Sequence, residues 1–164
     1  MAIEQALLTW IHLTSAAIWV GGSLFIGAVL APVLKTMSFS LEERLQIMIK
    51  VGRKFNKIAI PSLIILIVTG IYNSSSYFSN YELLLSTSYG NWLTIKIILV
   101  IALIITYIVH VRIIRGEVEE KIISKQLTEK QIQTLRKKII ILGEVIVVLS
   151  VAVLFIAAVL NVGI

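Results

Sequence analysis

The chain has 164 residues, of which 58% are hydrophobic and 15% are charged, and its mean hydropathy is +0.96. These values exclude a soluble domain and predict an integral membrane protein surrounded by a lipid bilayer. The absence of cysteine excludes disulfides, thiolate metal sites and iron–sulfur clusters, which leaves His, Met, carboxylate and backbone groups as metal ligands.

Four apolar segments follow one another along the chain, each near the ~20 residues that cross about 30 Å of hydrocarbon as a helix. The predicted spans cover about residues 6–34, 55–72, 92–111 and 139–162. The first segment lacks the basic start and the small-residue cleavage site of a signal peptide, so we predict that it remains as a helix. Because no internal repeat is visible, residues 1–164 are expected to form one domain.

Two capping-box patterns precede the second and fourth spans. Ser40 with Glu43, and Thr128 with Gln131, have the spacing that satisfies free backbone amides at the start of a helix. We therefore predict short cytoplasmic helices that lead into these spans. They cover residues 41–54 and 129–138.

The basic residues are distributed unevenly over the loops. Six of the 15 Lys and Arg lie between residues 35 and 57 and eight between 112 and 138, while residues 73–91 have none. By the positive-inside bias, both basic loops are cytoplasmic, and both termini and the second loop face outward. The predicted fold is an all-α bundle of four transmembrane helices, a multi-pass protein of the cell membrane. The net charge of +6 follows from this topology, so we expect no nucleic-acid partner.

Four ionisable residues fall within the predicted spans: His12, Lys96, His110 and Glu144. Each costs about 2.5–3.5 kcal/mol on insertion scales, so each needs a partner, an aqueous cavity or a cofactor. From a rise of about 1.5 Å per residue, His12 and Lys96 lie in the outer half of the bilayer, and His110 and Glu144 in the inner half. The two histidines differ by roughly 20 Å in depth, which excludes one shared haem iron.

The outer pair also has a helical phase that favours contact inside the bundle. His12 shares a face of the first span with Trp19 and with small residues that allow close helix approach. Lys96 shares a stripe of the third span with Tyr107 and His110. We therefore predict that His12 and Lys96 meet in the bundle. The structural alternatives are an interhelical hydrogen bond for His12 and snorkelling to water for Lys96.

The inner residues have two interpretations. Glu144 is expected to form an ion pair with Arg53, Lys57 or His110 at the cytoplasmic side. The functional alternative is that His110 and Glu144, at matched depth, form a proton-linked pair.

Motifs in all four spans resemble the copper-resistance protein D (CopD) superfamily, which includes the HemJ-type membrane proteins. They are His12 followed by "WVGG" and "APVL", "RKFNKIAIPSLIILIVTG", "GNWLTIKIILVIALI", and "GEVIVV" with Glu144. The resemblance implies a four-helix membrane bundle. The HemJ type binds haem b through a first-helix histidine and a third-helix lysine, which here are His12 and Lys96. Ala31 and Pro32 stand where that type has an arginine after the first helix, which argues against protoporphyrinogen oxidation.

Three functions are compatible with these features. The first is a haem b protein with His12 as axial ligand, Lys96 and Trp19 lining the site, and electron exchange with a quinone or another membrane subunit. The second is copper uptake or resistance, with His12 and His110 as stations where copper binds on its path. The soft donors that copper prefers are few, because the chain has three methionines and no cysteine. The third is a non-catalytic accessory or assembly subunit of a larger complex. Either a monomer or a homo-oligomer is compatible with the sequence.

Overall fold

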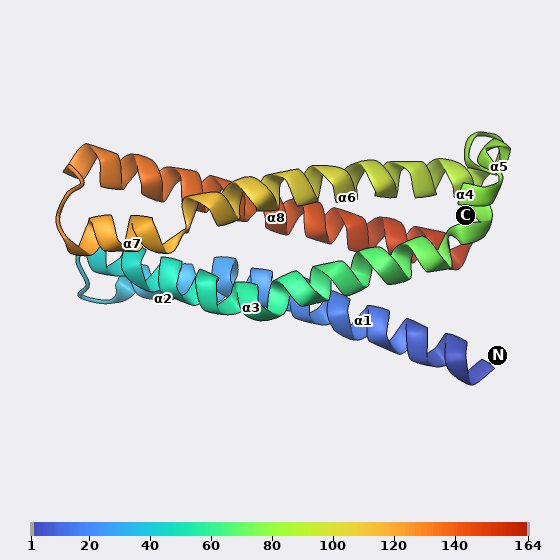
Figure 1. Cartoon of the computed structure of the whole chain (residues 1–164), viewed down its shortest axis with the longest axis horizontal. Helices are drawn as coiled ribbons and strands as arrows, with labels where there is room; N and C mark the ends of the chain where they lie inside the picture. The colour runs from blue at the N-terminus through green and yellow to red at the C-terminus, as the bar shows by residue number, and fades with distance from the viewer. Residues whose placement is uncertain (1, 164) are drawn as a thin grey trace.

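The computed structural model describes residues 2–163 and consists of long, nearly parallel helical rods (Figure 1). The first rod is continuous through α1 (Ala2–Leu24), the π-helix η1 (Phe25–Leu30) and α2 (Ala31–Thr36). The other long helices are α3 (Leu41–Asn73), α6 (Ser88–Ile113) and α8 (Glu129–Val162). The short helices are α4 (Ser75–Ser79), α5 (Tyr81–Ser86) and α7 (Gly116–Ile123).

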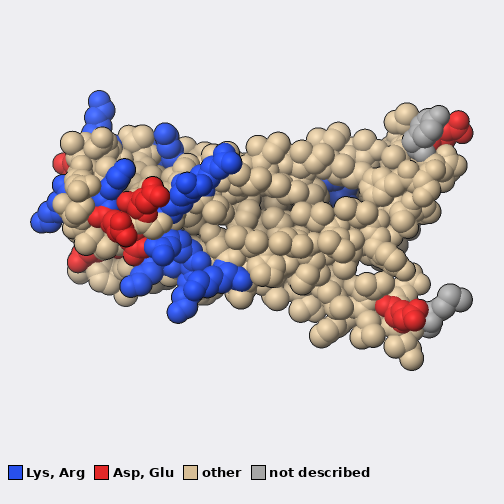
Figure 2. All heavy atoms as spheres, in the orientation of Figure 1, with Lys and Arg blue, Asp and Glu red and all other residues tan. Residues whose placement is uncertain are grey.

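Four helical segments are long and apolar enough to cross a membrane, which confirms the predicted all-α bundle of four transmembrane helices. Both ends of the chain lie at one end of the bundle, and the turn between α2 and α3, together with α7, lies at the other (Figure 1). Lys and Arg gather at that second end, apart from the long apolar surface (Figure 2). The positive-inside bias therefore places this end in the cytoplasm and the termini outside.

Helices α3 and α8 are longer than the spans predicted from hydropathy. Both capping boxes are present, at Ser40 with Glu43 and at Thr128 with Gln131, and each opens its helix as predicted. The cytoplasmic helices that they start run without a break into the spans, so α3 has 33 residues and α8 has 34. The predicted second and fourth spans thus correspond to the apolar parts of these longer helices.

The π-helix η1 departs from the regular helix expected over the first span. The Ala31 amide donates to the Ile26 carbonyl, five residues earlier, rather than to the carbonyl four residues earlier. Pro32 explains this position, because its ring would clash with the carbonyl of residue 28 in a regular α-helix and it has no amide to donate. The wider turn avoids that clash without breaking the rod.

The bundle has one core in the membrane and a second beyond it. Helix α1 packs mainly against α3 and α6 mainly against α8, while α1 and α8 provide contact between these two pairs. The membrane core consists of Trp19, Val20, Ala59, Leu103, Tyr107 and Ile146. The cytoplasmic core consists of Leu45, Ile49, Ile114, Ile122, Ile132 and Ile139. The cytoplasmic ends of the rods are therefore a packed structure and not frayed extensions.

The outer loop, predicted only as a polar loop, folds into α4 and α5. The α5 backbone lies against the start of α6 at Gly90, where an added Cβ would come within 2.1 Å of the Leu83 carbonyl oxygen. The rings of Tyr77 and Tyr89 stack at a centroid distance of 4.7 Å. This loop therefore forms an ordered cap at the outer end of the bundle.

Candidate functional site

A cavity of about 330 Å³ lies in the outer half of the bundle, between the α1–α3 pair and the α6–α8 pair. Every long helix contributes to its wall, and His12, Trp19 and Lys96 all line it. The rest of the lining is largely aliphatic, with Ser74 and Phe78 at the outer end. Its volume falls at the lower end of the range for small-molecule sites. The structure thus brings together all three residues that we predicted for the outer site.

The cavity lies near a part of the bundle where the helices diverge. The first turns of α1 point away from the other three rods (Figure 1), and the space-filling view shows a gap beside them (Figure 2). Exposed apolar side chains at Ile3, Leu7 and Trp10 face outward along these turns. The bundle is therefore open beside the first turns of α1.

His12 is held in a defined orientation by a threonine of α3. The Thr69 hydroxyl lies 2.6 Å from His12 Nδ1 and donates its own hydrogen to the Ile65 carbonyl at 2.6 Å. Because that hydroxyl has only one hydrogen, it accepts from His12 and the Nδ1 atom carries the ring proton. The Nε2 atom then keeps its lone pair, as a metal-ligating imidazole requires. This tautomer is assigned from the hydrogen-bond pattern.

Lys96 contributes a cation to the same cavity. Its side chain is half-buried, and no hydrogen bond or ion pair links it to another residue within 2–163. It lines the same cavity as His12. An ammonium in a mostly apolar wall needs an anionic partner, and the described chain supplies none there. The site is therefore suited to a ligand that has a negative group.

Trp19 closes the cavity on its inner side. Its indole Nε1 donates to the Ser150 hydroxyl at 3.0 Å, and Ser150 donates to the Ile146 carbonyl at 2.7 Å. The indole also meets the Tyr107 ring edge-on, with centroids 4.8 Å apart. The Tyr107 hydroxyl in turn donates to Asn56 Oδ1 at 2.9 Å. All four long helices are thereby joined below the cavity by two hydrogen bonds and one ring contact.

The inner residues do not come together in this way. His110 is partly buried on α6, whereas Glu144 is exposed on the outer surface of α8, and no hydrogen bond or ion pair joins them among residues 2–163. Of the predicted partners of Glu144, Arg53 instead forms an ion pair with Glu119 of α7. The rotation of α8 about its axis explains the difference, because it turns Glu144 away from α3 and α6. The inner pair therefore has no direct contact to support it.

Three polar residues at this site had no assigned role in the sequence analysis: Asn56, Thr69 and Ser150. A single hydroxyl or amide side chain changes little in the hydropathy summed over a whole span, so that sum does not mark these residues. Their presence inside otherwise apolar segments is the one signal that marks them, since such residues commonly form interhelical hydrogen bonds. Their partners, however, depend on how the helices pair.

Comparison with known proteins gives two similarities. The family model described as "Copper resistance protein D" (CopD) matches residues 49–160. An uncharacterized protein of Aquifex aeolicus (strain VF5) is 36% identical over 75 residues, which cover 45% of this chain and 50% of that protein. The match thus spans about half the length of this relative. No solved structure matches.

Proposed function

The chain belongs to the copper resistance protein D (CopD) family of membrane proteins, and we propose that its outer cavity binds haem b for electron transfer in the membrane. In this proposal His12 would hold the haem iron through Nε2, and the haem would exchange electrons with a quinone or another membrane subunit.

One observation carries the proposal: the His12 imidazole, with its Nε2 lone pair free, and the unpaired Lys96 ammonium line the same largely aliphatic cavity. Haem b combines an iron that takes one imidazole nitrogen, an apolar macrocycle and anionic propionates, so each part has a counterpart here. When bound, the haem would supply one-electron chemistry, which its protein surroundings tune.

Each residue has a separate role in this arrangement. Thr69 fixes the ring orientation and the tautomer of His12. Lys96 is positioned to neutralise a carboxylate. Trp19, held by Ser150, would form the inner wall of the site and limit the access of water to it. The chain's own contribution is therefore ligation, charge compensation and exclusion of water.

Copper handling is the second candidate, and the description of the family favours it. The donor set argues against a copper site of several ligands, because residues 2–163 contain no group of three His, Cys, Asp or Glu side chains that could hold a metal ion. His110, the second station of the copper hypothesis, does not line the cavity with His12. A single imidazole remains able to bind one copper ion.

The test is a visible spectrum of the detergent-purified protein with and without dithionite, together with metal analysis. We expect a Soret band with sharp reduced α and β bands, lost in His12→Ala and retained in the control His110→Ala. Stoichiometric copper without haem would replace the proposal with the copper candidate. A colourless, metal-free protein from haem-supplied cells would favour an accessory subunit.

A further inference from the structure

A second groove of about 330 Å³ lies on the membrane-facing surface near the cytoplasmic end, between the first rod and α3. It shares no residue with the outer cavity, and it is independent of the proposed function. Six of the residues that line it are apolar or glycine: Gly22, Phe25, Ile26, Val51, Phe55 and Ile58. Lys50 and Lys54 complete the lining.

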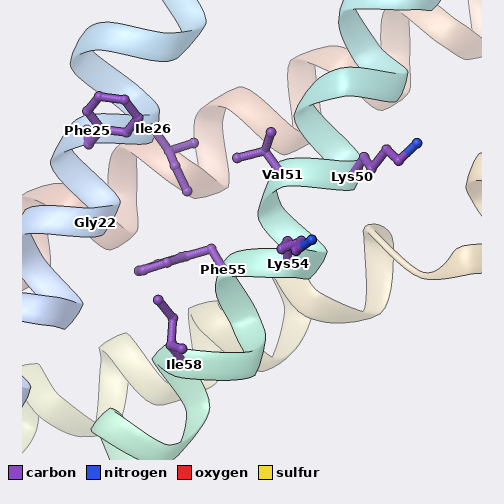
Figure 3. A pocket seen from close by; sticks show the side chains of 8 residues that line it. All are labelled: Gly22, Phe25, Ile26, Lys50, Val51, Lys54, Phe55 and Ile58. Carbon is purple, nitrogen blue, oxygen red and sulfur yellow. The ribbon is translucent and has the colours of Figure 1, made fainter.

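The apolar floor of the groove forms where α1 and α3 approach each other closely. An added Cβ at Gly22 would lie 2.2 Å from Cε2 of Phe55, so only glycine leaves room for this ring. The π-helix η1 adds Phe25 and Ile26 from the other side. Phe25 and Ile58 are each 56% exposed and would lie against lipid chains. Figure 3 shows Phe55 and Ile26 between the two helices and Phe25 in front of the first rod, while the two lysines extend from α3 on the side away from that rod.

The two lysines are free charges at the depth of lipid headgroups. They lie one turn apart on the same face of α3, so both amines can reach a single phosphate. Among residues 2–163 neither forms an ion pair or hydrogen bond, whereas Arg53 between them pairs with Glu119. They lie within about a turn and a half of Phe55, where the predicted apolar span begins. The groove is thus cationic at the headgroup level and apolar below it.

We infer that this groove binds one anionic phospholipid of the cytoplasmic leaflet, with its phosphate between Lys50 and Lys54 and an acyl chain along Phe25, Phe55 and Ile58. Basic pockets between transmembrane helices on the cytoplasmic side commonly bind anionic headgroups in this way. A second copy of the chain is a poor occupant, because a symmetric contact through this face would bring the unpaired lysines of both copies together.

The experiment measures lipid retention by native mass spectrometry of the full-length protein, released from detergent after exposure to phosphatidylglycerol or phosphatidylcholine. We expect one phosphatidylglycerol molecule to remain bound and phosphatidylcholine to be lost. The double variant Lys50→Gln/Lys54→Gln should bind phosphatidylglycerol roughly thirtyfold more weakly, from about fivefold per lysine near an anionic surface. All the side chains changed are exposed, and circular dichroism checks that the variant remains folded.

A matched control removes the same charge elsewhere on the cytoplasmic end. Lys121→Gln/Lys125→Gln changes two exposed lysines outside the groove and should retain phosphatidylglycerol as the original chain does. Equal losses in the two double variants would overturn the inference, because attraction would then be a property of the whole basic end. Equal retention of both lipids, displacement by glycerol phosphate at millimolar concentration, or a lipid-free dimer would also overturn it.

Discussion

At the scale of single residues, Thr69 shows how a neutral side chain can orient a histidine inside a membrane bundle. Its hydroxyl accepts a hydrogen bond from His12 Nδ1 because its own hydrogen is donated to the Ile65 carbonyl within the same helix. Threonine in a helix often donates its hydroxyl hydrogen to a backbone carbonyl of the same helix. The hydroxyl oxygen can then accept a hydrogen bond from another helix, as it does here. The imidazole is therefore on α1, while the hydroxyl that fixes its tautomer is on α3.

We expect Thr69→Val to weaken haem binding about tenfold to a hundredfold, which is the usual effect of removing a partner that orients a metal-ligating histidine. Valine has the same shape but cannot accept the Nδ1 proton, so Nε2 is no longer favoured as the free nitrogen. The measurement is a titration of haem-depleted protein, followed at the Soret band. Thr106→Val is the control, since the Thr106 hydroxyl bonds only to Ala102 of its own helix. Wild-type affinity in Thr69→Val would contradict the assigned tautomer.

At the scale of helices, the contacts of the first rod depend on one glycine. Gly21 and Gly22 are adjacent in the sequence, but an added Cβ at Gly21 has nothing within 4 Å, whereas at Gly22 it meets the Phe55 ring. Small residues at helix interfaces allow this kind of close approach in membranes, where no hydrophobic force drives helices together. Alanine substitutions at the two glycines therefore distinguish a change in packing between helices, at Gly22, from a change in helix propensity alone, at Gly21.

Gly22→Ala is expected to lower the free energy of unfolding by about 1–3 kcal/mol, because Phe55 must move to admit the new methyl group. Gly21→Ala introduces the same methyl group into open space and should leave stability unchanged or raise it by up to about 1 kcal/mol. Reversible unfolding in mixed detergent micelles measures both variants. Equal stabilities would show that α1 and α3 do not approach as closely as described.

The cytoplasmic helix α7 is held mainly by one isoleucine. Ile122 is 1% exposed within the cytoplasmic core, and the neighbouring Ile123 is 61% exposed. The ion pair between Arg53 and Glu119 also joins α7 to α3, but side chains that are 47% and 17% exposed contribute little, about 0–1 kcal/mol. Apolar burial therefore dominates the docking of this helix.

We expect Ile122→Ala to lower the free energy of unfolding by about 2–5 kcal/mol and to release α7 from α3. Ile123→Ala should change that free energy by no more than about 0.5 kcal/mol. Hydrogen exchange of residues 116–123 is the measurement, because undocking should accelerate exchange in α7 before the transmembrane helices are affected. Similar protection factors in the two variants would mean that burial of Ile122 does not anchor the helix.

At the scale of the whole molecule, the rods exceed the bilayer. Helices α3 and α8, with 33 and 34 residues, extend about 50 Å against about 30 Å of hydrocarbon. The excess is on the basic side, where a separate core packs α3, α7 and α8 together. The molecule is therefore asymmetric along the membrane normal, with a folded cytoplasmic end and a short outer cap.

The orientation can be tested directly because the chain has no cysteine of its own. Ser76→Cys places a thiol on the outer cap and Ser124→Cys places one after α7, both at exposed positions. A membrane-impermeant maleimide should label the first in intact cells and the second only after the membrane is permeabilised. The reverse pattern would invert the assignment of the two basic loops.

The bundle could be predicted because hydropathy summed over about 20 residues leaves little ambiguity. Its orientation, inferred from the charge of whole loops, stays a prediction. The convergence of His12 and Lys96 in one cavity also agrees with their predicted depth and phase. Their role as a cofactor site stays a prediction.

The other features of the fold and of the site depend on how each helix is rotated and on local geometry. Hydropathy and charge summed over many residues carry no information on either. The position of Glu144 is decided by how far α8 turns about its axis, and α8 is apolar on every side of its membrane part. The π-helix before Pro32, the cap helices and the docked α7 each depend on a few specific contacts. Bonds such as that between Trp19 and Ser150 could not be inferred from sequence, because they join residues 131 positions apart.

The outer cavity lies along a seam between two helix pairs that each pack well internally. A molecule that fills it would touch both pairs and replace the packing that they lack there. Binding to the folded chain alone, at a hundred times the dissociation constant, adds about 2.7 kcal/mol of stability. If the proposed ligand binds there, cells deprived of it would hold a chain whose two helix pairs separate more readily, so the steady-state amount of this protein would follow the supply of that ligand.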